Sequence, residues 1–151
     1  MIDYRPLLFI LGILLTTISV VMILPAIVDG ALGNPDWQVF AASSVITLFL
    51  GICLILGNRM DTFSFTIHQA FLLTTTSWLV IVCFAALPFM FSNLDMSLTD
   101  SFFEAMSGIT TTGSTVITDL NNAPPGILLW RALLQWLGGI GIIVMAIAIL
   151  P

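Results

Sequence analysis

Four long apolar runs, separated by short polar segments, dominate the sequence. They cover residues 7–28, 39–56, 71–91 and 125–150. An α-helix rises 1.5 Å per residue, so about 20 apolar residues cross the ~30 Å hydrocarbon core of a bilayer. Each run is long enough for that or nearly so. The pattern therefore predicts an all-α membrane protein with four transmembrane helices.

Composition supports this class and excludes others. Of 151 residues, 59% are hydrophobic and 7% are charged, whereas an ordinary soluble domain carries about 25% charged residues. Three cations against eight acids give a net charge of −5, so the chain lacks the cations that neutralise nucleic-acid phosphates. No Ser/His/Asp, Cys/His or paired-carboxylate arrangement is present either. We expect lipid as a partner, no nucleic acid, no cofactor and no enzymatic activity.

The few charges predict the orientation in the membrane. Arg5 precedes the first run and Arg59 follows the second, so both lie on one side of a four-crossing topology. The opposite side carries only acids, namely Asp29, Asp36, Asp95, Asp100, Glu104 and Asp119. Basic residues favour the cytoplasmic side. We therefore expect a multi-pass protein of the cytoplasmic membrane with both termini in the cytoplasm.

A polar segment between the third and fourth runs carries the candidate chemistry. It reads SLTDSFFEAMSGITTTGST over residues 97–115 and begins with a predicted helix over about 98–108, capped by Ser97 or Thr99 and ended by Gly108. Such a helix is roughly 15 Å long, half a bilayer. Irregular polar backbone at that depth must be buried in protein or line a water-filled cavity. The segment is either a re-entrant pore loop or a polar extracytoplasmic loop with a surface helix.

The residues after this helix, at about 109–115, favour extended backbone. Threonine is stiff at χ1, and Gly113 permits a positive φ or a close approach. A strand of this kind presents rows of carbonyl oxygens, which can replace the water shell of a monovalent cation. The C-terminal end of the preceding helix is partially negative and favours the same charge. We therefore expect a filter strand for a cation.

These residues resemble a known family. SFFEAMSGITTTGSTVITDL, followed by PPGILLWRALLQWLGGIGIIVMAIAILP, is similar to the first pore repeat of the Trk/Ktr/HKT superfamily of potassium transporters, closest to its TrkH/TrkG branch. The resemblance implies an N-terminal transmembrane helical pair over 1–57. It also implies the first helix–pore loop–helix repeat over 58–151. Four such repeats surround one K⁺ pathway in the family.

The resemblance also implies roles for individual residues. Thr110, Thr111, Thr112, Gly113 and Ser114 correspond to the filter, where the carbonyls of Thr111 and Thr112 are the expected K⁺ ligands. In the family the filter glycine, here Gly113, goes with K⁺ preference, whereas serine in some plant members goes with Na⁺ transport. Glu104 either supports the backbone behind the filter or adds negative potential to the outer mouth. We favour the supporting role.

One repeat supplies one quarter of a filter. We therefore expect a fragment of a four-repeat potassium uptake protein, and we expect the isolated chain not to conduct. The open alternatives are a homotetrameric cation channel and a non-conducting membrane assembly subunit. The partners would be the remaining repeats or other copies of the chain. For the whole transporter, the resemblance implies a cytosolic nucleotide-binding regulatory subunit similar to TrkA.

Two features of the last apolar run have open interpretations. Arg131 lies about six residues inside it, where it is either an interfacial anchor or the partner of an acid such as Asp119. Ala132, Gly139 and Ala146 share one face, with Gly138 beside them. Small residues on one face allow close approach of another helix, and a glycine hinge is the alternative.

Overall fold

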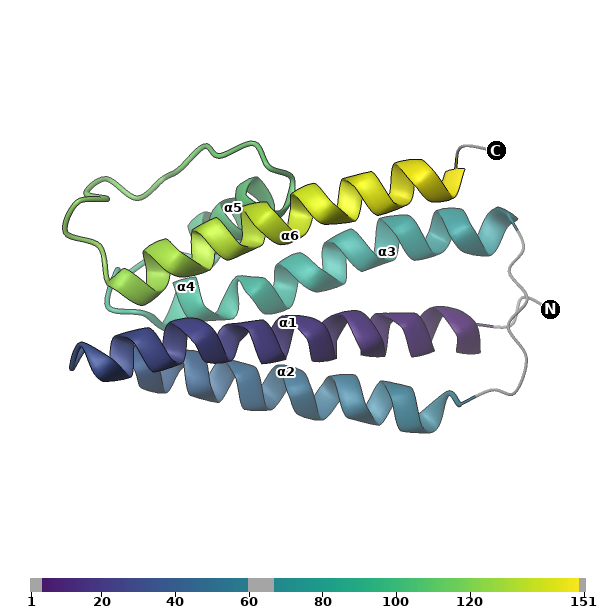
Figure 1. Ribbon diagram of the computed structural model, residues 1–151, viewed down its shortest axis with the longest axis horizontal. Helices are drawn as coiled ribbons and strands as arrows, with labels where there is room; N and C mark the ends of the chain where they lie inside the picture. The colour runs from purple at the N-terminus through teal and green to yellow at the C-terminus, as the bar shows by residue number, and fades with distance from the viewer. Residues whose placement is uncertain (1–3, 60–66, 150–151) are drawn as a thin grey trace.

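The computed structural model describes residues 4–59 and 67–149, which form helices and connecting segments with no strand in those ranges. Residues 60–66 of the predicted first repeat, and residue 150 at the end of the fourth apolar run, lie outside them. The helices are α1 (Arg5–Ala31), α2 (Trp37–Gly57), α3 (Ile67–Ala85), α4 (Leu87–Phe91), α5 (Leu98–Ile109) and α6 (Pro125–Ile149). Figure 1 shows the long helices side by side along one axis. Three spans in the described part are long and apolar enough to cross a membrane, namely Arg5–Ala31, Trp37–Gly57 and His68–Phe91.

Helices α1 and α2 form a tight antiparallel pair. A Cβ atom on Gly12 of α1 would lie 2.8 Å from the carbonyl oxygen of Gly51 on α2, so glycine allows the two backbones to touch. The hydroxyl of Ser44 donates to the carbonyl of Ser19 across the same interface, at 2.7 Å. Lipid provides no hydrophobic force between helices, so small residues and interhelical hydrogen bonds hold such pairs together.

The third apolar run, predicted as a single helix, is interrupted at Ala86 between α3 and α4. Pro88 explains the interruption, because proline lacks an N–H and its ring clashes with the carbonyl of the residue four positions earlier. The indole N–H of Trp130 on α6 donates to the carbonyl of Ala85 at this point, at 3.0 Å. The break in the third run is thus a contact point for α6.

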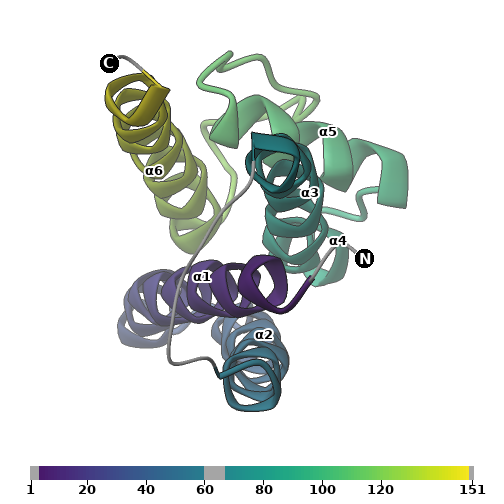
Figure 2. The ribbon, with the colours of Figure 1, turned by 90° about the vertical axis from the view of Figure 1, so that its right-hand side faces the viewer.

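The buried core lies where the α1–α2 pair meets the rest of the chain. Trp130 and Phe40 are fully buried, and their rings make an edge contact with centroids 6.3 Å apart. Met22, Val82, Phe89 and Leu134 belong to the same cluster. Seen along the bundle, α1 and α2 lie on one side and α3, α5 and α6 on the other (Figure 2). The core thus connects the α1–α2 pair to the part of the chain that carries the predicted filter.

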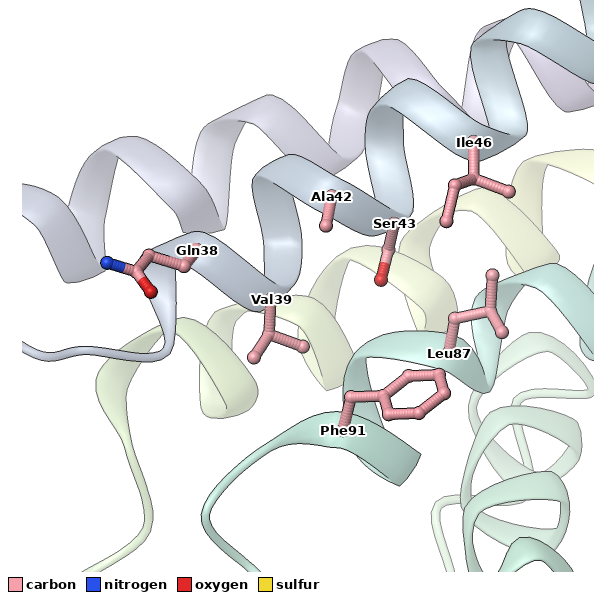
Figure 3. Close-up of a pocket in the computed structure, with 7 residues that line it drawn as sticks. All are labelled: Gln38, Val39, Ala42, Ser43, Ile46, Leu87 and Phe91. Atoms are coloured by element: carbon pink, nitrogen blue, oxygen red, sulfur yellow. The ribbon is translucent and has the colours of Figure 1, made fainter.

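A groove of about 330 Å³ lies between α2 and α4 (Figure 3). Its wall is apolar, with polar atoms only at the side chains of Gln38 and Ser43. None of its lining residues ionises, and none belongs to α5 or to the polar segment that follows it. The candidate site therefore lies elsewhere, at the end of α5.

Candidate functional site

Helix α5 begins and ends with local hydrogen bonds that its sequence provides. Ser97 is the N-cap in extended conformation, and its hydroxyl accepts from the amide of Asp100 at 3.1 Å. The last turn ends at Thr110, whose hydroxyl donates to the carbonyl of Met106 at 2.8 Å. The helix occupies the place where the sequence predicts a short helix, and it extends one residue past Gly108.

The backbone after α5 folds back onto the end of the helix. The amide of Thr111 donates to the carbonyl of Gly108 at 2.9 Å, and the amide of Thr110 donates to Met106. The amides of Thr112 and Gly113 both donate to the carbonyl of Ser107, at 3.0 and 3.2 Å. Four successive N–H groups are therefore directed into the last turns of α5.

The predicted filter strand is wrong as a description of this backbone. Residues 110–115 form no strand, and φ is +59° at Thr111 and +78° at Gly113. A positive φ is expected of glycine, but it is uncommon for a residue with a β-branched side chain. The stiffness of threonine favours extended backbone only in isolation, and here the hydrogen bonds to α5 outweigh that preference.

The carbonyl groups of residues 110–113 receive no hydrogen bond from the described part of the chain. In residues 4–59 and 67–149, no group donates to the carbonyl oxygens of Thr110, Thr111, Thr112 or Gly113. The carbonyl of Ser114 differs, because it accepts from the hydroxyl of Ser107 at 2.6 Å. The side chains from Thr111 to Ser114 are exposed. Four consecutive carbonyl oxygens are thus available to coordinate a dehydrated cation.

Glu104 supports this segment from the buried side of α5. One of its oxygens accepts from the amide of Val116 at 3.0 Å and from the hydroxyl of Thr115 at 3.1 Å. The other accepts from the guanidinium Nε of Arg131 on α6. The carboxylate is fully buried, and charged groups buried in this way require such partners. Its contacts hold the backbone that follows residue 114.

The partner of Arg131 differs from the sequence expectation. Asp119 was the candidate partner, but its carboxylate accepts from the side chain of Asn122, and Arg131 pairs with Glu104. The guanidinium is mostly buried beside this carboxylate. Arg131 therefore joins α6 to α5.

Two glycines permit the close approach of α5 and α6. A Cβ atom on Gly138 would lie 1.8 Å from the carbonyl oxygen of Ile109, and one on Gly108 would lie 3.0 Å from Cβ of Leu134. Gly139 is different, because the nearest atom to its Cβ among the described residues would be the Thr111 methyl, at 3.9 Å. Of the predicted small-residue face, Gly138 is the position that the contact with α5 requires.

The geometry brings all six predicted site residues together. Glu104 and residues 110–114 lie at and behind the C-terminal end of α5. Sequence reasoning missed Ser107, whose carbonyl and hydroxyl organise residues 112–114. The signal was its position three residues before the threonine run, on the helix face that meets the returning chain.

Comparison with known proteins identifies the family. The TrkH family model, described as "Cation transport protein", matches residues 36–151. The chain belongs to the TrkH family. This confirms the resemblance found in the sequence, and it makes the chain part of a family of transporters. The family and the apolar helices together show that it is a multi-pass bacterial membrane protein.

Curated TrkH-family relatives match almost the whole chain. The Trk system potassium uptake protein TrkI of Halomonas elongata is 40% identical over 148 residues, 98% of this chain and 30% of its own length. The potassium uptake protein TrkH of Vibrio parahaemolyticus is 41% identical over 155 residues, covering 99% and 31%. TrkH of Escherichia coli is 38% identical over 149 residues, covering 98% and 31%. The chain spans about a third of the length of these relatives.

A solved TrkH structure has the same fold. The crystal structure of the potassium transporter TrkH from Vibrio parahaemolyticus superimposes with a TM-score of 0.93 at 38% identity. The match covers 99% of this chain and 32% of that one. The helical arrangement described above is therefore that of the corresponding third of a TrkH-family transporter.

Proposed function

We propose that this chain supplies one quarter of the selectivity filter of a TrkH-like potassium uptake transporter. In this proposal the chain is part of a longer four-repeat protein of the bacterial cytoplasmic membrane. Support comes from the family and from relatives named as potassium uptake proteins. The activity of the whole transporter is carried over from those relatives.

The single observation that carries the proposal is the opposite use of amides and carbonyls in residues 110–113. Their four amides donate to α5, and their four carbonyls receive no donor from the described residues. K⁺ filters use backbone carbonyl oxygens in place of hydration water. An anion site would require the reverse, with amides free to donate. The segment therefore suits a cation and disfavours an anion.

Within the proposed filter, Thr111 and Thr112 supply the principal carbonyl ligands, with Thr110 beside them. Ser114 ends the filter, because Ser107 already occupies one lone pair of its carbonyl. Gly113 sets the preference for K⁺, and its φ of +78° is one that glycine adopts without strain. Glu104 is a positioning residue, because its carboxylate contacts the backbone behind the filter.

The proposed topology has four crossings, with α6 as the fourth and α5 as a re-entrant pore helix. The positive-inside rule, applied to Arg5 and Arg59, supports a topology with both termini in the cytoplasm. Residues 1–57 form the helical pair and 58–151 the first repeat. The remaining repeats complete the filter, and a cytosolic nucleotide-binding subunit similar to TrkA would regulate the whole transporter. No cofactor is required.

Growth at low external K⁺ tests the proposal. The host lacks its own potassium uptake, and the test protein joins this chain to the remaining repeats of the Vibrio parahaemolyticus relative. We expect rescue by the joined protein and none by the chain alone. Rescue by the chain alone would instead indicate a homotetrameric channel. A joined protein that reaches the membrane without rescue would contradict the proposal and favour an assembly subunit.

A further inference from the structure

Two buried carboxylates flank the turn between α1 and α2. Asp29 lies in the last turn of α1 and Asp36 is the N-cap residue of α2. Both side chains are almost completely buried, and the Oδ2 atom of each has no hydrogen-bond partner within the described ranges. Burying a carboxylate costs free energy unless its oxygens accept hydrogen bonds. The contacts of Asp29 and Asp36 therefore need an explanation.

Asp29 binds the start of α6. Its Oδ1 accepts from the amide of Gly126 at 2.7 Å, in the first helical turn, where N–H groups have no partner inside the helix. A carboxylate is favourable at this end of a helix. A Cβ atom on Gly126 would lie 2.2 Å from Oδ2 of Asp29. Glycine at this position is what allows the carboxylate to reach the backbone.

Asp36 binds the segment that follows α4. Its Oδ1 accepts from the backbone amide of Asn93 at 3.3 Å and from the side-chain amide of the same residue at 2.5 Å. Asn93 stands two residues after the end of α4. The two bonds join α2 to this one residue through both its backbone and its side chain.

Asn93 and Gly126 are the two ends of one segment. This segment, here called the pore loop (residues 93–126), contains α5 and the proposed filter. Figure 1 shows the α1–α2 turn at the same end of the bundle as the start of α6 and the chain leaving α4. One turn of the N-terminal pair thus contacts the pore loop where it begins and where it returns to a helix.

We propose that Asp29 and Asp36 are positioning residues that hold the pore loop by its two ends and thereby fix the filter. This proposal rests on the proposed function. It also gives the N-terminal pair a role in ion selection, although none of its residues contacts residues 110–114 through a hydrogen bond in the described structure. The hydrogen bonds from the filter to α5 determine the conformation of the filter. The two carboxylates determine the position of α5 and the pore loop relative to α6.

Amide hydrogen exchange in lipid discs tests the positioning directly. The variants are Asp29→Ala and Asp36→Ala, and the readout is exchange at the amides of Thr112 and Gly113. Loss of a buried hydrogen bond is expected to raise exchange there by about tenfold or more. The matched control is Asp119→Ala, which removes an exposed carboxylate from the pore loop itself and is expected to leave both amides protected.

The conservative variant Asp36→Asn separates bonding from charge. It keeps an acceptor oxygen for Asn93, so we expect it to retain the protection that Asp36→Ala loses. Where an alanine variant loses its helical circular dichroism, Gly126→Ala and Asn93→Ala replace it, because they act on the same bonds from the loop side. Unchanged exchange at Thr112 and Gly113 in every folded variant would overturn the proposal.

Ion preference supplies a readout that a purely structural role would not move. In the joined transporter, Asp29→Ala and Asp36→Ala are expected to lower the ratio of K⁺ to Na⁺ uptake, whereas Asp119→Ala leaves it unchanged. If the parent transporter takes up K⁺ and the ratio is the same in all variants, the positioning role is wrong and the proposed function stands. If the parent takes up no K⁺, the proposed function fails and amide exchange alone decides the positioning role.

Discussion

Gly138 of α6 lies against the carbonyl oxygen of Ile109, so closely that a Cβ atom on this glycine would lie 1.8 Å from that oxygen. Ile109 is the last residue of α5, and residues 110–113 follow it directly. The position of the proposed filter thus depends on a backbone contact between two helices. Because a backbone atom cannot move aside as a flexible side chain can, any larger residue must push α5 away.

The first prediction concerns this contact. Gly138→Ala is expected to destabilise the fold by about 1–3 kcal/mol, because it overpacks the helix interface. It should also weaken K⁺ uptake by the joined transporter, since the end of α5 moves. Thermal unfolding in detergent and uptake assays measure the two effects.

Gly139→Ala is the matched control on the same helix. In the described structure its Cβ would meet the Thr111 methyl at an ordinary contact distance of 3.9 Å. Replacing a helical glycine by alanine stabilises by roughly 0.5–1 kcal/mol. We expect a stability equal to or above that of the parent. Equal losses in both variants would mean that the α5–α6 contact has no special role.

The second prediction concerns the buried pair of Glu104 and Arg131. Removing one partner leaves the other charge buried and unpaired, which costs about 3–5 kcal/mol. Glu104→Gln and Arg131→Met should each destabilise the protein strongly. The double variant should lose less than the sum of the two, with a coupling energy of roughly 0.5–3 kcal/mol. Strict additivity in detergent unfolding would show that the two side chains do not stabilise each other.

The third prediction concerns the hydroxyl of Ser107. Ser107→Ala removes the bond to the Ser114 carbonyl and should cost about 0.5–1.5 kcal/mol. It should also lower the ratio of K⁺ to Na⁺ uptake, because the end of the filter loses its support. Ser101→Ala is the control, since that hydroxyl donates to the carbonyl of Ser97, the N-cap residue at the opposite end of α5. A selectivity change as large in Ser101→Ala would argue against a specific role of Ser107.

The fourth prediction is a pH dependence that Asp36 contributes. Burial raises the pKa of this carboxyl above its ordinary value of 3.8, although the Asn93 amide lowers it in part. The folded state therefore binds the proton more tightly than the unfolded state does. The resulting stabilisation is complete below 3.8 and is lost as pH rises through the raised pKa.

Unfolding of parent and Asp36→Asn over a pH series checks the fourth prediction. The parent's advantage over the variant should decline as pH rises from the unfolded pKa to the folded one and then stay level. Subtracting the variant removes the contributions of those carboxyls that do not interact with Asp36. An advantage that grows with pH would mean that the folded-state pKa of Asp36 is lowered.

Sequence periodicity and length predicted the long helices well. The apolar runs at 7–28 and 39–56 lie within α1 and α2. The short helix α5 followed from a capping serine and a glycine near its end. These features are local, and local physical chemistry determines them.

The errors arose where distant residues decide the structure. Nothing near Arg131 indicates that Glu104, 27 residues earlier, is its partner. The burial of Asp29 depends on Gly126, 97 residues away. The positive φ of Thr111 goes against the preference of its own side chain and is set by the bonds of its neighbours to α5. The position of the filter on the chain stays a prediction, and the conformation of residues 110–113 depends on these contacts.

The most direct measurement of the central claim is competition between K⁺ and Na⁺ for uptake by the joined transporter, with Gly113 and with Gly113→Ser. Gly113 has a φ of +78°, a backbone conformation that is strained for serine. The carbonyl of residue 113 lies in the proposed filter. We predict K⁺-preferring uptake in the parent and a clear loss of that preference in the variant, with both proteins present equally in the membrane. The same K⁺ preference in both would contradict the assignment of residues 110–113 as the filter.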